Sequence, residues 1–173
     1  DFSLLKARES VKTAFLFPGQ GAQTVGMGAD VYQVYPEARR VFDEADEILG
    51  FPLSQLCFQG PEDELTDTAN AQPAILVTSL ALYELVGSRF AEVDCVAGHS
   101  LGEYTALVAS GALGFADAVR LTRQRGEWMK QAGDRSPGGM AAILNLADEL
   151  LESVCRQAAE ETGGVVQIAN YNS

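Results

Sequence analysis

The pattern of apolar and polar positions in the first half of the chain predicts strands that alternate with helices. A short β-rich segment, 13–17, runs into the turn-forming sequence Pro-Gly-Gln-Gly at 18–21. After Pro36, apolar residues recur at helical spacing as far as Gly50, which is typical of an amphipathic helix. Residues 73–87 are apolar almost all round, as in a helix buried against a sheet. We therefore expect an α/β fold.

The second half begins with another strand and helix and ends in a small separate unit. An apolar segment at 93–97 predicts a strand, and 103–109 and 115–132 have helical patterns. The sequence QAGDRSPG at 131–138 combines proline, glycine and mixed charge, which indicates a linker. Beyond it, the pattern predicts a strand at 140–146, a helix at 147–161 and a strand at 165–169.

The sequence Gly-His-Ser-Leu-Gly at 98–102 lies between a predicted strand and a predicted helix. This is the order of a nucleophile elbow, in which a serine sits on a strained turn between small neighbours. Such a serine is exposed near a helix N-terminus, whose amide groups can stabilise a developing oxyanion. Ser100 is therefore the candidate nucleophile. The alternative is a tight turn whose serine only caps the helix.

Acidic side chains outnumber basic ones by 24 to 12, which gives a formal net charge of −12. This balance disfavours a nucleic-acid-binding protein, because phosphate binding needs clustered lysine and arginine. Residues 117–135 carry five basic and three acidic side chains, whereas 37–67 carry two basic and nine acidic ones. One of the arginines in the basic stretch could hold a substrate carboxylate through two hydrogen bonds. The alternative is a solvated helix face.

Few residues suit metal binding, disulfide formation or membrane insertion. The sequence lacks a run of roughly 20 apolar residues that could span a bilayer, and 1–12 lack the apolar core of a secretion signal. Cys57, Cys95 and Cys155 lie far apart, so we expect neither a disulfide framework nor a zinc site, and a reducing cytoplasm fits best. His99 is the single histidine, so a separate histidine base would have to come from elsewhere.

Four motifs together carry a resemblance to a known family. They are FPGQGAQ at 17–23, AQPA at 71–74, GHSLGEY at 98–104 and RG at 125–126. Their order and spacing resemble the malonyl-CoA:acyl carrier protein transacylases of fatty-acid synthesis and the related acyltransferase domains of polyketide synthases. The resemblance implies an α/β-hydrolase-like core with an inserted ferredoxin-like small subdomain, only partly contained in this chain. Residues 1–131 would then be the first part of the core, 132–138 a linker, and 139–173 the first half of the subdomain.

The resemblance also implies roles for individual residues. Ser100 matches the acylated serine, and Arg125 matches the arginine that grips the free carboxylate of the malonyl group. Gln20 and the backbone amide of Leu101 correspond to the oxyanion hole. The further substrate-binding candidates are His99 before the nucleophile, the pocket glutamine Gln72, and the pocket-lining Asn170 and Asn172.

The implied reaction is a ping-pong acyl transfer. Ser100 attacks the thioester of malonyl-CoA, and the acyl-serine then gives its malonyl group to the phosphopantetheine thiol of an acyl carrier protein. Coenzyme A and phosphopantetheine enter as substrates, so neither a cofactor nor a metal is expected. Carrier proteins of these pathways are acidic and would need a positive docking patch on this acidic chain. The candidates for that patch are Arg120, Arg123, Lys130 and Arg135.

Two other classes of protein share part of this pattern. A GxSxG serine hydrolase or thioesterase would use Ser100 but needs an acidic residue and a histidine after it, and it gives no role to Gln20 or Arg125. A non-catalytic module that docks a carrier protein would suit the missing histidine. Release of free malonate faster than transfer to carrier protein would favour the hydrolase, and failure to acylate Ser100 even with the missing segment supplied would favour the docking module.

The resemblance also implies a catalytic histidine that this chain does not supply. Family members are considerably longer, and their histidine lies in the part that follows. Adjacent side chains diverge at an elbow, so His99 is a poor base for Ser100. We expect a second segment or chain to complete the small subdomain and to bring a histidine within reach of the Ser100 hydroxyl, roughly 2.6–3.2 Å away.

Overall fold

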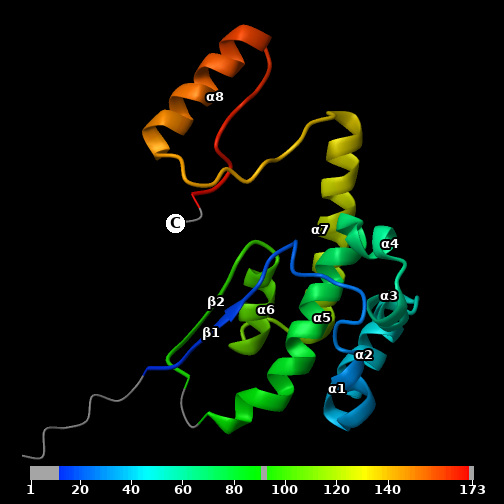
Figure 1. The fold of residues 1–173 in the computed structure, drawn as a ribbon. Helices are drawn as coiled ribbons and strands as arrows, with labels where there is room; N and C mark the ends of the chain where they lie inside the picture. Colours follow the sequence, from blue (N-terminus) through cyan, green and yellow to red (C-terminus); the bar gives the residue numbers. More distant parts are fainter. Residues whose placement is uncertain (1–11, 91–92, 172–173) are drawn as a thin grey trace, which may run out of the picture. The chain divides into compact units, whose positions relative to one another are not determined.

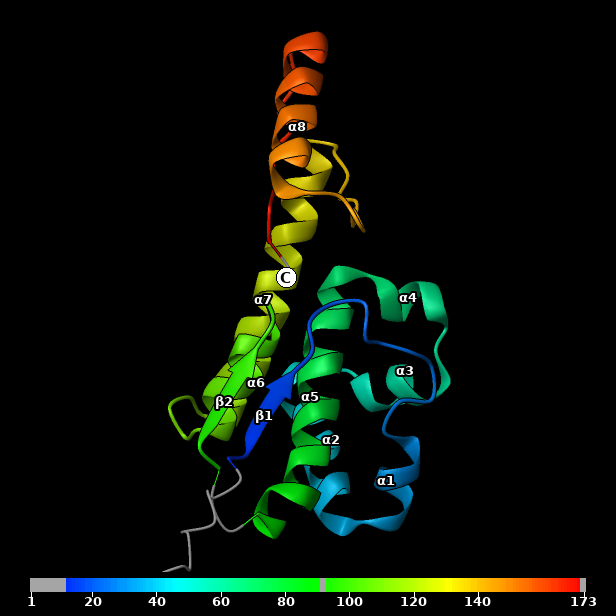
Figure 2. The ribbon, with the colours of Figure 1, turned by 60° about the vertical axis from the view of Figure 1, so that its left-hand side comes forward.

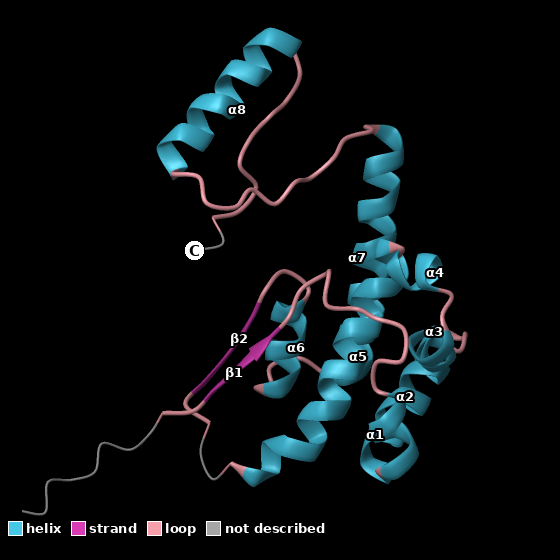
Figure 3. Cartoon of the chain, in the orientation of Figure 1, coloured by secondary structure: helices cyan, strands magenta, loops and turns pink. Residues whose placement is uncertain are grey.

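The computed structural model describes residues 12–90 and 93–171. The chain divides into two compact units, 1–136 and 137–173. The first unit combines several helices with the strands β1 and β2, as Figures 1 and 3 show, so the expected mixture of helix and sheet is confirmed. Its described elements are β1 (Ala14–Phe17), α1 (Ala29–Val34), α2 (Pro36–Leu49), α3 (Leu53–Gln59), α4 (Glu62–Thr66), α5 (Thr68–Val86), a 3-10 turn (Gly87–Arg89), β2 (Cys95–Gly98), α6 (Gly102–Ala109) and α7 (Phe115–Arg135).

The strands β1 and β2 form a parallel pair, with α6 packed against both (Figures 1 and 2). The register runs from Ala14 opposite Cys95 to Phe17 opposite Gly98. Both predicted strands are confirmed, with boundaries that shift by one or two residues. Because the strands are parallel, the turn after β1 and the serine turn after β2 leave the same edge of the sheet. This edge brings residues 18–21 and Ser100 together.

The helix predicted after Pro36 is confirmed as α2. It buries Ala38, Val41, Phe42 and Ala45 on one stripe, and these residues pack with α3, α5 and α7 in the core. The helix ends where Gly50 takes a left-handed conformation, with φ of 73°, and donates its N–H to the Asp46 carbonyl.

The buried helix expected at 73–87 is α5, but it begins five residues earlier, at Thr68. Asp67 caps it by accepting a hydrogen bond from the Ala69 N–H at 3.0 Å. Pro73 therefore lies inside the helix and not at its start. Proline has no N–H to give to the carbonyl four residues earlier, which is that of Ala69. Arg123 of α7 supplies the missing donor, with its Nη1 3.1 Å from the Ala69 carbonyl oxygen.

The helix α7 packs closely along the first turns of α5. A Cβ atom at Gly126 would lie 2.5 Å from the Thr68 carbonyl oxygen, so only glycine permits this approach. The helix runs on to Arg135, which makes residues 132–135 of the linker predicted at 132–138 helical. Pro137 explains why it goes no further, because the residue before a proline is disfavoured in a helix.

The second unit contains α8 (Asp148–Thr162), which confirms the helix predicted at 147–161. The strands predicted on either side of it, 140–146 and 165–169, are wrong for the described residues, where both segments lack strand structure. Short apolar runs favour a strand, but only a neighbouring backbone completes one through hydrogen bonds. Met140, Leu144 and Val165 are at least 80% exposed, so these apolar side chains lack the packing that a strand would give them.

Candidate active site

The turn between β2 and α6 has the geometry of a nucleophile elbow. Ser100 has a positive φ of 56°, a left-handed conformation that is strained for a residue with a side chain. Two local contacts hold this turn: the His99 N–H donates to the Phe17 carbonyl at 3.0 Å, and Gly98 and Gly102 approach so closely that a Cβ at Gly98 would collide with the Gly102 carbonyl. These contacts hold the strained turn in place and so fix the backbone that carries the Ser100 hydroxyl.

The Ser100 hydroxyl lies beside a guanidinium group. Nη2 of Arg125, on α7, is 2.9 Å from Ser100 Oγ, and Nη1 of the same side chain donates to Gln72 Oε1 at 2.5 Å. Gln72 lies on α5 and is fully buried, whereas Arg125 is half-buried. One arginine thus bridges the serine turn and α5, and its charge is held next to the candidate nucleophile.

A hydrogen-bonded chain continues from Gln72 to the turn after β1. Gln72 Nε2 donates to Thr68 Oγ1 at 3.1 Å, and Thr68 Oγ1 is 2.9 Å from Gln20 Oε1. The structure therefore brings together four residues that the sequence motifs singled out: Ser100, Arg125, Gln72 and Gln20. Thr68 joins them and belongs to none of the motifs. Its position one helical turn before Gln72 is the only sequence signal that could have identified it.

The other candidate residues have different surroundings. The Leu101 side chain is fully buried, and its backbone N–H, just before α6, has no acceptor among the described residues. His99 is exposed, and its ring lies against Gly19, where a Cβ would be 2.5 Å from Nδ1. Within the described residues, His99 makes no hydrogen bond to Ser100. Asn170 is exposed and belongs to the second unit, and Asn172 lies outside the described residues.

Comparison with known proteins places this chain in a family. The family model described as "Acyl transferase domain" matches residues 14–172. The chain belongs to the acyl transferase domain family. It is 53% identical over 161 residues to a malonyl CoA-acyl carrier protein transacylase of Bacillus subtilis, an alignment that covers 93% of this chain and 50% of that protein.

Solved structures of the acyl transferase domain family agree with this assignment. MCAT from Streptococcus pneumoniae is 50% identical and superposes with a TM-score of 0.84, over 94% of this chain and 52% of that one. A malonyl-transacylase solved with a type II PKS acyl-carrier protein is 39% identical, with a TM-score of 0.79, over 87% of this chain and 49% of that one. The chain spans about half the length of the relatives it matches.

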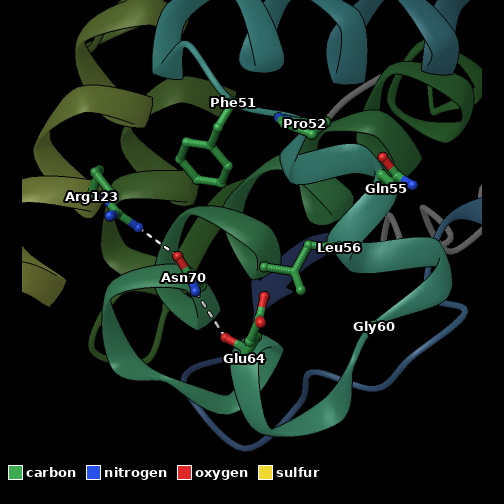
Figure 4. A pocket seen from close by; sticks show the side chains of 8 residues that line it. All are labelled: Phe51, Pro52, Gln55, Leu56, Gly60, Glu64, Asn70 and Arg123. Carbon is green, nitrogen blue, oxygen red and sulfur yellow. Dashed lines mark hydrogen bonds between the residues drawn. The ribbon is translucent and has the colours of Figure 1, made fainter.

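In this acyl transferase domain, Arg123 serves as an internal anchor of the α5–α7 contact. Its Nη1 also donates to Asn70 Oδ1 at 2.5 Å, its Nε pairs with Glu127 at 2.7 Å, and its guanidinium lies 5.1 Å from the centre of the Phe51 ring. Figure 4 shows Arg123 directed at Asn70, whose amide is directed in turn at the Glu64 backbone. Arg123, Asn70, Glu64 and Phe51 are among the residues that line a cavity of about 370 Å³. Few hydrogen-bond donors of the Arg123 guanidinium therefore remain available to a docking partner.

Two other residues of the predicted docking patch also have carboxylate partners. Arg120 is 3.4 Å from Asp117, and Lys130 forms an ion pair with Asp67 at the start of α5. These pairs reduce the positive charge that the surface offers to an acidic partner. The patch therefore remains a prediction, with less charge behind it than the sequence indicated.

The described residues contain no group of three or more His, Cys, Asp or Glu side chains that could hold a metal ion. Across the same part of the chain, none of the helices is long and apolar enough to cross a membrane. Cys57 is buried in the core, and burial raises the pKa of its thiol to about 12, which keeps it protonated and unreactive.

The ion pair between Lys130 and Asp67 predicts a pH-dependent contribution to stability. The hydrogen bond from Lys130 lowers the pKa of Asp67 below its usual value. A carboxyl group with a lowered folded-state pKa stabilises the fold above its unfolded pKa, about 3.9, and loses that effect as the pH falls through the folded value. Replacing Lys130 with glutamine should lower the melting temperature by about 2 °C at pH near 7.

Thermal melting of the wild-type and Lys130→Gln proteins at several pH values measures this effect. The difference between them should shrink as the pH falls through the folded-state pKa of Asp67, because a protonated carboxyl group no longer pairs with Lys130. Lys130→Arg is the control and should melt like the wild type. A difference that does not shrink at acidic pH would show that Lys130 stabilises α7 in another way.

Proposed function

We propose that the protein transfers a malonyl group from malonyl-CoA to the phosphopantetheine thiol of an acyl carrier protein, through an acyl-serine intermediate. The observation that carries the proposal is the contact of Arg125 Nη2 with Ser100 Oγ, because it sets a carboxylate-binding group beside a strained serine. The names of the relatives support the substrate, and the transacylase solved with a carrier protein supports the partner.

In the first half-reaction, the Ser100 hydroxyl attacks the thioester carbonyl of malonyl-CoA. An ester bond forms to Oγ, the C–S bond breaks, and the thiolate of coenzyme A leaves and takes up a proton. The Leu101 amide and the Gln20 side chain stabilise the oxyanion of the tetrahedral intermediate. In the second half-reaction, the carrier thiol attacks the ester, and Ser100 regains its proton. The proposal leaves the general base unassigned, because the only hydrogen-bond partner of Ser100 Oγ among the described residues is Arg125.

Arg125 selects the acyl group in this proposal. Gln72 holds Nη1, so Nη2 can leave Ser100 and bind the free carboxylate of the malonyl group. A guanidinium suits this task because it stays charged and forms directional bonds to carboxylate oxygens. An acetyl group has no carboxylate and gains nothing from this contact.

The same proposal includes the architecture that the resemblance implies. Residues 1–131 belong to an α/β-hydrolase-like core, 132–138 connect it to the next part, and 139–173 belong to a ferredoxin-like small subdomain. Coenzyme A and phosphopantetheine act as substrates, so the reaction uses no resident cofactor.

The partition of labelled malonyl groups between carrier protein and water tests the proposed function. The native protein is mixed with labelled malonyl-CoA, with and without the phosphopantetheine form of a carrier protein. We expect the label to appear on the carrier thiol many times faster than as free malonate. The carrier protein without its phosphopantetheine arm is the control and should stay unlabelled. Release of malonate that is faster than transfer to the carrier would identify a hydrolase. No turnover of malonyl-CoA would exclude both the transferase and the hydrolase.

A further inference from the structure

The Thr68 hydroxyl lies between two glutamine side chains that come from different parts of the fold. It is 3.1 Å from Gln72 Nε2 on α5 and 2.9 Å from Gln20 Oε1 in the turn after β1. A hydroxyl has one proton to donate and lone pairs to accept with. Thr68 can therefore accept from one amide and donate to the other at the same time, which no apolar residue of the same shape can do.

Arg125 determines the direction of these hydrogen bonds. A guanidinium only donates, so the atom of Gln72 that faces Arg125 Nη1 must be the oxygen, Oε1. The Gln72 Nε2 group must then face Thr68, and the single Thr68 proton is left for Gln20 Oε1. The opposite orientation of the Gln72 amide would set N–H against N–H at Arg125. The chain therefore runs in one direction from Arg125 to Gln20.

The Thr68 hydroxyl is also held in place by its backbone. Thr68 and Gln72 are four residues apart on α5, so their side chains lie one above the other. Asp67 caps the helix just before Thr68, and the close approach of Gly126 packs α7 on the Thr68 carbonyl. The acceptor for Gln72 is thus built into the first turn of the helix.

We propose that Thr68 is a positioning residue for acyl transfer. Arg125 fixes which way the Gln72 amide faces, and the Thr68 hydroxyl holds that orientation and passes it on to the Gln20 amide. Through Gln72, it holds the guanidinium beside Ser100. At the other end, it occupies the Gln20 oxygen, so that the Gln20 Nε2 group is the part available to donate to an oxyanion. This inference rests on the proposed malonyl transfer and adds a residue to its site.

Substitutions that separate the hydroxyl from the shape of the side chain test this role. Thr68→Val keeps the branched shape without the hydroxyl, and Thr68→Ser keeps the hydroxyl. We expect kcat/KM for malonyl transfer to fall about tenfold in Thr68→Val, the effect of one lost hydrogen bond, and to stay within about twofold of wild type in Thr68→Ser. The matched control is Thr122→Val on α7, whose buried hydroxyl bonds only to carbonyls of its own helix and whose loss should not change the rate.

A readout without substrate keeps the two proposals distinguishable. In protein labelled with nitrogen-15 glutamine, the side-chain N–H protons of the fully buried Gln72 should exchange slowly with water. Exchange should be at least about tenfold faster in Thr68→Val and unchanged in Thr68→Ser and Thr122→Val. A wild-type protein that does not transfer malonyl groups but shows this pattern would contradict the proposed function alone. Equal rates and equal exchange in Thr68→Val and wild type would overturn the role of Thr68.

Discussion

Replacing Ser100 with alanine is expected to abolish the covalent malonyl-enzyme and to lower kcat for transfer by at least about 10⁴-fold. The reason is geometric as well as chemical. The positive φ of Ser100 belongs to the elbow turn, which sets its hydroxyl 2.9 Å from Arg125 Nη2. Mass spectrometry of the protein after brief exposure to malonyl-CoA measures the covalent adduct, and peptide mapping locates it.

Ser110→Ala provides the matched control for that experiment. Ser110 follows α6, is exposed, and bonds through its hydroxyl to the Leu107 carbonyl of the preceding turn. Its replacement should leave both adduct and rate unchanged. An adduct that persists in Ser100→Ala would mean that another residue is the nucleophile, and the elbow would then have to be interpreted as a helix cap.

The second large effect is expected in Arg125→Ala, as a change of acyl selectivity. Loss of a charge-assisted hydrogen bond to the malonyl carboxylate removes about 1.5–3 kcal/mol, so kcat/KM for malonyl transfer should fall about 10- to 150-fold. Acetyl transfer should fall much less, because an acetyl group makes no such bond. Competition between labelled malonyl-CoA and acetyl-CoA measures the ratio directly.

Two further variants help to interpret the result for Arg125→Ala: one keeps the charge, and the other is a control. Arg125→Lys keeps the charge but cannot bond to Gln72 and to a carboxylate as a fork, so its selectivity should lie between those of alanine and wild type. Arg40→Ala removes an exposed arginine that pairs with Glu84 at 3.7 Å, and it should change neither rate. Equal losses of malonyl and acetyl transfer in Arg125→Ala would remove the carboxylate-binding role and leave Arg125 as a support for Ser100.

The serine turn could be predicted from the sequence because its determinants are local. Gly98, Ser100 and Gly102 lie within five residues, and their order between a strand and a helix is sufficient to predict the elbow. The distance from Ser100 to Arg125 could not be predicted in this way. It depends on how closely α7 packs on α5 at Gly126, which is a property of two helices and not of one segment.

Two sequence-based predictions differ from the structure for different physical reasons. The predicted helix follows the apolar pattern, which begins at Pro73, whereas α5 begins at Thr68 after the polar cap Asp67. The segments 140–146 and 165–169 have the composition of strands, but hydrogen bonds to a neighbouring backbone are needed to form them. The start of α5 therefore depends on a local cap, whereas the strands depend on a neighbouring segment, which leaves only a weak pattern in the sequence.

The hydrogen bond from Arg123 to the Ala69 carbonyl has a mechanical consequence. Because Pro73 cannot close its own helical turn, α5 completes that turn with a donor from α7, and the two helices share one hydrogen-bond ladder at this point. Sliding α7 along α5 would leave this carbonyl without a donor and would drive Gly126 against the α5 backbone. The two helices therefore behave as one rigid body at this contact. Arg125 is not displaced relative to Gln72 by sliding of one helix along the other. If Ser100 carries an acyl group, as we propose, rotation of side chains can make room for it while this helix contact stays in place.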